Sequence, residues 1–225
     1  MISLNILNIK HAIPRDELKP ISVLFLSVLI LAIHKTFGSI PFAQQIFSGT
    51  SEYGTVLGLA PLFLINLGFK ESIKNYGLII GDWKTGLKII AILFPVISLF
   101  VLYPSIYNQE MVNFYPQSKE AAGSIKLFLK FEAIRILFFY TGWEIFFRGF
   151  MLFGLRKHVG DAMAICIQII PSCLWHIGMP TGEIFASIFG GILFGMMALK
   201  TGSILYPYIL HCLIGLTLDL FIVLN

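Results

Sequence analysis

Long apolar runs, repeated along the chain, are the feature that most restricts how this sequence can fold. Runs such as ISVLFLSVLILAI and ILYPYILHCLIGLTLDLFIVL approach or reach the length of about 20 residues with which a helix crosses a bilayer. Of the 225 residues, 57% are hydrophobic and only 12% are charged, whereas soluble domains carry about 25% charged residues. The composition therefore excludes a soluble enzyme and a disordered chain, and it indicates a polytopic membrane protein.

The spacing of these runs predicts an all-α, polytopic transmembrane helical bundle of about seven spans. The predicted spans are residues 19–37, 54–69, 86–104, 125–155, 161–177, 183–199 and 203–224. We expect one structural domain, in which residues 1–124 supply the N-terminal spans and loops and residues 125–225 supply the helices with the polar motifs. No small-residue cleavage signal follows the first apolar run, so the N-terminal segment is expected to be an uncleaved anchor.

The basic residues predict how the chain is oriented in its membrane. They gather at alternate joints between the spans: Lys10, Arg15, Lys19, Lys70, Lys74, Lys84, Arg156, Lys157 and Lys200. Because cytoplasmic loops are enriched in Lys and Arg, we expect a cytoplasmic N-terminus and an external C-terminus. The net charge of +4 is spread over these joints, which favours an integral protein of the plasma membrane, with the lipid bilayer and not nucleic acid as its partner.

Several ionisable residues stand inside the predicted spans, where a charge costs about 2.5 to 3.5 kcal/mol and is a functional candidate. They are Glu132, Arg135, Glu144 and Arg148 in the fourth span, His176 in the fifth, Glu183 at the start of the sixth, and His211 and Asp219 in the seventh. For Glu132 and Arg135 we expect interfacial side chains that extend to the membrane surface.

Glu144 and Arg148 are four residues apart, so they share one helix face and are expected to form an ion pair. Such a pair either keeps Glu144 ionised as a base or only ties this helix to its neighbours, and the spacing leaves both roles open. His176 and His211 follow Pro171 and Pro207 closely. A proline loosens its helix and frees carbonyl groups, so we expect both histidines to share a mid-membrane pocket with Glu144.

A zinc site is not favoured, and no cofactor is predicted. Cys173 and His176 have a CxxH spacing, and His211 is followed by Cys212, but consecutive helical residues point about 100° apart and no HExxH motif occurs. The cysteines are expected to pack as small apolar residues. Ser187, Gly191 and Gly195 are each four residues apart, and this stripe predicts a close helix contact.

Three segments together resemble the CAAX protease and bacteriocin-processing family of intramembrane endopeptidases. They are GWEIFFRGFMLFGL, then PSCLWHIGMP, then GGILFGMMALKTGSILYPYILH. The resemblance implies a glutamic-type peptidase that cleaves a membrane-tethered protein or peptide. It implies that Glu144 and His176 orient and deprotonate a water molecule, that His211 holds the oxyanion, and that Arg148 fixes the carboxylate.

The chain departs from this family at two positions that bear on catalysis. Trp143 stands where the family commonly has the first of two glutamates, and Gly215 stands where Asn or Asp often assists the oxyanion. We expect Asp219 to substitute at the second position, and Glu183 either to orient His176 or to favour its own helix N-terminus. The alternative is a catalytically silent member that acts as a membrane partner-binding or immunity protein.

Overall fold

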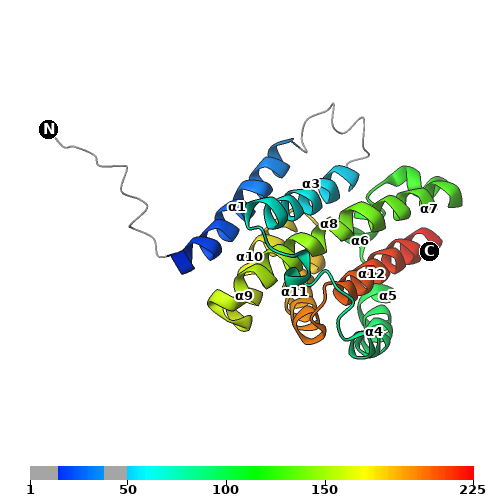
Figure 1. Ribbon diagram of the computed structural model, residues 1–225. Helices are drawn as coiled ribbons and strands as arrows, with labels where there is room; N and C mark the ends of the chain where they lie inside the picture. The colour runs from blue at the N-terminus through cyan, green and yellow to red at the C-terminus, as the bar shows by residue number, and fades with distance from the viewer. Residues whose placement is uncertain (1–14, 38–49) are drawn as a thin grey trace.

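The computed structural model describes residues 15–37 and 50–225, and within them the regular structure is entirely helical (Figure 1). The all-α prediction is therefore confirmed. The longer α-helices are α1 (Arg15–Phe37), α3 (Thr50–Phe63), α4 (Trp83–Ile97), α7 (Ile125–Ile134), α10 (Asp161–Trp175), α11 (Thr181–Thr201) and α12 (Leu205–Leu224). The expected anchor lies partly in residues 1–14, outside the described residues.

Among the described residues, four helices are long and apolar enough to cross a membrane: Trp83–Ser105, Ile125–Val159, Thr181–Thr201 and Leu205–Leu224. They correspond to the third, fourth, sixth and seventh predicted spans. The shorter apolar helices Gly54–Gly68 and Asp161–Trp175 correspond to the second and fifth, and α1 covers the first. The protein is an integral membrane protein built as a helical bundle.

The span Ile125–Val159 is the central helix of the bundle, and 72% of its most apolar window is buried inside the protein. It runs through α7, a π-helical stretch η6 (Arg135–Tyr140), α8 (Thr141–Glu144), a second π-helical stretch η7 (Ile145–Phe153) and α9 (Gly154–Val159). The wider π-helical turns change which residues share a face, and such turns often occur at functional sites. Here they flank Glu144 on both sides.

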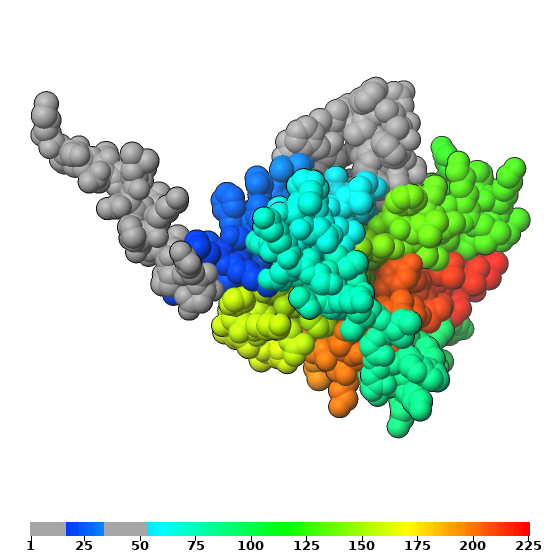
Figure 2. Space-filling view, viewed as in Figure 1, coloured from blue at the N-terminus to red at the C-terminus, as the bar shows by residue number. Residues whose placement is uncertain are grey.

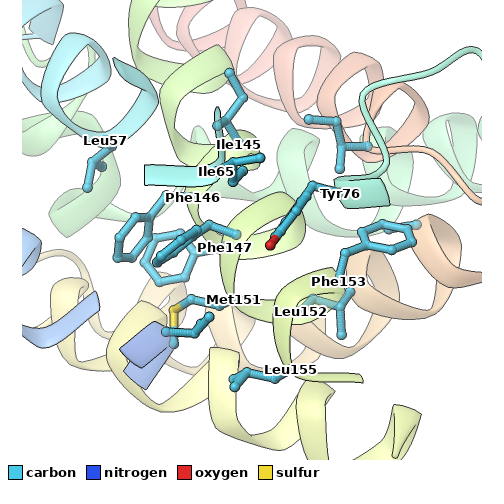
Figure 3. Packing of buried hydrophobic residues seen from close by; sticks show 14 of the residues in the cluster. Leu57, Ile65, Tyr76, Ile145, Phe146, Phe147, Met151, Leu152, Phe153 and Leu155 are labelled. Atoms are coloured by element: carbon cyan, nitrogen blue, oxygen red, sulfur yellow. The ribbon is translucent and has the colours of Figure 1, made fainter. Parts of the chain in front are cut away.

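The central helix and α12 (Leu205–Leu224) each pack into an apolar cluster. The larger one surrounds η7 and includes Phe146, Phe147 and Leu152, with Leu57 from α3 and Tyr76 from the 3₁₀ helix η3 (Ile73–Tyr76) (Figure 3). The second lies between α4, α11 and α12 and consists of Ile90, Phe194, Met197, Tyr206 and Leu210. The central helix is therefore anchored through η7, and α12 is anchored through Tyr206 and Leu210 in its first half.

The stripe of small residues on α11 packs against α10, as predicted. A Cβ atom added to Gly191 would lie 2.7 Å from the side chain of Ile169, and one on Gly195 would lie 3.1 Å from Ile165. The close approach also lets the buried Gln168 amide donate a hydrogen bond to the Gly191 carbonyl at 2.9 Å. This contact ties the middle of α10, eight residues before His176, to α11.

The segment 69–82 crosses the middle of the molecular face shown in Figure 2, in turquoise. It contains η3 (Ile73–Tyr76) and turns at Gly77 and Gly81, whose φ angles of 77° and 61° suit glycine. Glu71 forms an ion pair of 2.9 Å with Lys19 of α1. The segment therefore lies over the central helix in a defined conformation.

Candidate active site

Glu144, the last residue of α8, lies at the centre of a buried polar group. One of its carboxylate oxygens, Oε1, lies 2.8 Å from Nδ1 of His211 and 3.3 Å from a guanidinium nitrogen of Arg148. The predicted pair of Glu144 and Arg148 is therefore confirmed. Glu144 is fully buried, and its other oxygen, Oε2, has no hydrogen-bond partner among the described residues. The protein thus holds Oε1, whereas Oε2 can still accept a hydrogen bond.

His211, from α12, is surrounded by aromatic rings. The ring centroids of Tyr140, Phe194 and Trp143 lie 4.6, 5.3 and 6.3 Å from the imidazole centroid. The contact of Nδ1 with a carboxylate oxygen requires a hydrogen on Nδ1, because an ionised carboxylate only accepts. In the neutral imidazole the lone pair is therefore on Nε2.

His176 is held at the end of α10, one residue beyond the helix. Its Nδ1 lies 2.7 Å from the carbonyl oxygen of Ser172, so Nδ1 carries a hydrogen and the neutral ring presents its lone pair on Nε2. The indole of Trp143 contacts this ring at 5.5 Å as well as the ring of His211. The structure therefore places the two histidines around Trp143, with His211 alone in direct contact with Glu144.

Glu183 stands in the first turn of α11, and its main partner is Tyr115. The Tyr115 hydroxyl lies 2.6 and 2.7 Å from the two carboxylate oxygens, while Nε2 of His176 is 4.0 Å from the nearer one. Burial, and then the charge of Glu183, raise the pKa of the Tyr115 phenol well above its ordinary value, so this hydroxyl remains a donor. Glu183 thus lies near His176 without a direct hydrogen bond.

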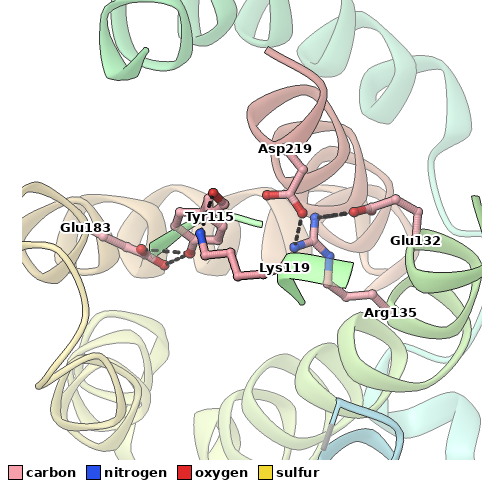
Figure 4. Close-up of polar contacts among 6 residues, drawn as sticks. All are labelled: Tyr115, Lys119, Glu132, Arg135, Glu183 and Asp219. Carbon is pink, nitrogen blue, oxygen red and sulfur yellow. Dashed lines mark hydrogen bonds and ion pairs between the residues drawn. The ribbon is translucent and has the colours of Figure 1, made fainter. Parts of the chain in front are cut away.

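A second buried charged group lies farther along the same two helices (Figure 4). Arg135 of the central helix is 2.8 Å from Asp219 of α12 and 3.1 Å from Glu132. All three residues are at most 2% exposed. The expectation that Glu132 and Arg135 extend to the interface is wrong, because α12 supplies a carboxylate that keeps the guanidinium inside. Asp219, expected beside His211, instead pairs with Arg135.

A cleft with a volume of about 450 Å³ reaches Glu144 from the side of the 69–82 segment. Its polar lining comes from Thr141, Glu144 and Tyr208, and the rest is mostly apolar: Gly77, Leu78, Ile79, Ile80, Ile145, Ile204 and Leu205. A hydrogen bond of 2.7 Å from the Tyr206 hydroxyl to the Ile80 carbonyl holds the part of the lining that residues 77–80 supply. An apolar cleft with a few convergent polar groups is typical of a substrate site.

The side chains around Glu144 do not fit a metal ion. Over residues 15–37 and 50–225, no three His, Cys, Asp or Glu side chains converge as ligands. The oxygen nearest the imidazole of His211 also faces the guanidinium of Arg148 at 3.3 Å, and a cation there would be repelled.

Comparison with known families identifies this part of the chain. Residues 129–217 match the family described as Type II CAAX prenyl endopeptidase Rce1-like. This part of the chain is similar to the CAAX protease family. The matched segment contains Glu144, His176 and His211 and most of the central helix and α12. No curated protein and no solved structure matches the chain.

Two functional candidates were not predicted from the sequence. Tyr140 is four residues before Glu144 and packs on His211, and Tyr115 reaches Glu183 from a distant loop. A tyrosine is uncharged, so within an apolar run it does not stand out as a functional candidate in the way that a charged residue does. The only available signal for Tyr140 is its four-residue spacing from Glu144, which places both on one helix face.

Proposed function

We propose that this protein is an intramembrane glutamic-type endopeptidase that uses no metal and hydrolyses a peptide bond of a membrane-associated substrate. The supporting observation is the state of Glu144: Oε1 is held by His211 and Arg148, whereas Oε2 has no partner among the described residues. The residue also lines the cleft. The similarity of residues 129–217 to the CAAX protease family supports the same reaction class.

In this proposal Oε2 of Glu144 accepts a proton from a water molecule in the cleft. The water oxygen forms a bond to the carbonyl carbon, and the π electron pair moves to the carbonyl oxygen. The oxygen's electron pair then re-forms the C=O bond as the C–N bond breaks; the C–N electron pair goes to the nitrogen, which takes the proton from Glu144, and the products are a carboxyl group and an amine. Arg148 and the Nδ1–H of His211 hold the other oxygen of Glu144 in place, and general base catalysis of this kind is worth about 10² to 10⁴ in rate.

His176 has the geometry of a second base. Its Nε2 carries the lone pair, and Glu183 lies 4.0 Å from that atom. A nearby carboxylate stabilises an imidazolium through its charge. We therefore assign His176 to orienting the water, with Glu183 as the residue that positions and supports it.

The apolar cleft suits an extended, mostly apolar segment of a membrane-tethered protein or peptide. It is lined by residues 77–80 and by the start of α12, next to the joints that contain Lys74, Lys84 and Lys200. With the N-terminus in the cytoplasm, as the positive-inside rule predicts, the cleft faces the cytoplasmic side. We assign the protein to the plasma membrane in this orientation.

A second candidate function rests on Trp143. This indole stands at the position of the first family glutamate, is 2% exposed, and contacts both imidazoles. An aromatic side chain there occupies space beside the histidines without offering a carboxylate. The corresponding function is a catalytically silent member that binds a partner protein in the membrane.

The substitution Glu144→Gln separates these two functions. We expect it to lower cleavage of a membrane-tethered peptide library by at least about a hundredfold, because an amide cannot accept the water proton. The measurement uses the purified full chain in detergent or proteoliposomes, with thermal unfolding followed in parallel. Glu120→Gln, at an exposed position of the 3₁₀ helix η5 (Lys119–Gly123), is the matched control and should cleave at the wild-type rate.

Equal cleavage by the wild type and Glu144→Gln would contradict the proposal. If the wild type cleaves nothing and partner binding survives Glu144→Gln, the silent, partner-binding function is supported instead.

A further inference from the structure

The central helix and α12 meet along a seam of three successive contacts. Glu144 contacts His211 at 2.8 Å, and Arg135 contacts Asp219 at 2.8 Å. On α12 these partners are eight residues apart, two α-helical turns. On the central helix they are nine residues apart, because η6 adds a wider turn. Tyr140 and Gly215 stand between the two charged contacts, one turn from each.

Tyr140 and Gly215 fit each other as a large and a small residue. A Cβ atom on Gly215 would lie 1.7 Å from the Tyr140 hydroxyl oxygen and 3.1 Å from a guanidinium nitrogen of Arg135. Any side chain at position 215 would therefore displace the hydroxyl. The glycine leaves the phenol oxygen against α12, one turn beyond His211 and near Arg135.

Tyr140 is buried between charged and aromatic side chains. The ring lies 4.6 Å from the His211 imidazole, and the Arg135 guanidinium lies 5.4 Å from the same ring centroid. The side chain is 5% exposed, so it is held in a water-poor site where a hydrogen-bond donor has its largest electrostatic effect.

We infer that Tyr140 is a further catalytic residue, whose hydroxyl donates a hydrogen bond to the carbonyl oxygen of the scissile bond as that oxygen becomes negative. The inference rests on the proposed function. Tyr140 precedes Glu144 by four residues on the same face, and one helical turn of about 5.4 Å is a separation that a water bound to Glu144 and the carbonyl oxygen of the bond it attacks can span. No proton leaves the phenol, and Arg135 strengthens its donor character.

The substitution Tyr140→Phe tests the hydroxyl alone, because the ring against His211 is kept. We expect kcat for the peptide substrate to fall about ten- to a hundredfold, which is at or below the loss usually seen when one oxyanion donor is removed, while KM changes less than about twofold. A tyrosine that only packs would leave kcat unchanged, and that result would overturn the inference. Glu144→Gln is measured beside it: if the proposed function fails, Glu144→Gln cleaves like the wild type, whereas failure of the inference alone leaves only Tyr140→Phe at the wild-type rate.

Two double variants separate hydrogen bonding from space filling. Tyr140→Ala with Gly215→Asn returns an amide donor from α12, and Tyr140→Ala with Gly215→Leu returns a side chain of similar size without one. We expect both to raise the unfolding temperature above that of Tyr140→Ala, but only the Asn variant to regain at least about tenfold in kcat. Equal cleavage by the Asn and Leu variants would overturn the inference.

Discussion

Gly142→Ala is expected to lower the free energy of unfolding by about 3 kcal/mol, a large effect for one methyl group. Gly142 of α8 lies against the backbone of α3, and its Cβ atom would be 2.1 Å from the carbonyl oxygen of Gly54. Backbone atoms cannot rotate away as a side chain does, so α3 would have to move. Equilibrium unfolding in mixed micelles measures the change.

Gly190→Ala is the matched control for this experiment. Gly190 lies in α11, and an added Cβ atom meets nothing within 4 Å. Alanine is favoured over glycine in a helix by up to about 1 kcal/mol, so this variant should be as stable as the wild type or slightly more stable. Equal destabilisation of both variants would show that the close approach of α3 and α8 is not what makes Gly142 necessary. Because α8 ends at Glu144, loss of this contact should also reduce cleavage.

Arg135→Met is expected to destabilise the protein by about 3 to 5 kcal/mol, since it leaves two buried carboxyl groups without their guanidinium. Glu132 and Asp219 are 2% and 0% exposed, and water cannot take the place of Arg135 there. Arg156 offers a comparison, because it pairs with Asp161 at 2.8 Å on the surface. Arg156→Met should cost less than about 1 kcal/mol.

A triple variant tests the physical cause of this loss. Adding Glu132→Gln and Asp219→Asn to Arg135→Met removes the unpaired charges, so much of the lost unfolding free energy should return. If the triple variant is no more stable than Arg135→Met, the loss comes from packing around the arginine stem and not from uncompensated charge.

The helical spans, and the ion pair of Glu144 and Arg148 within one helix, were predictable from the local sequence. The apolar runs placed helices that the structure contains, because length and hydropathy alone decide whether a segment suits the hydrocarbon core. The contact between Glu144 and Arg148 followed from their four-residue spacing. The stripe of Ser187, Gly191 and Gly195 likewise indicated close packing, which α10 provides.

The contacts between helices were decided by the tertiary structure. Arg135 was expected at the interface, yet Asp219 from α12 holds it inside, and Tyr140 reaches His211 only because Gly215 leaves space. The sequence spacing within a helix determines which residues share a face, but not how far that helix is rotated or shifted against another. In this protein the π-helical stretch η6 also changes the register between Tyr140 and Arg135, and that register aligns the three contacts of the seam with α12.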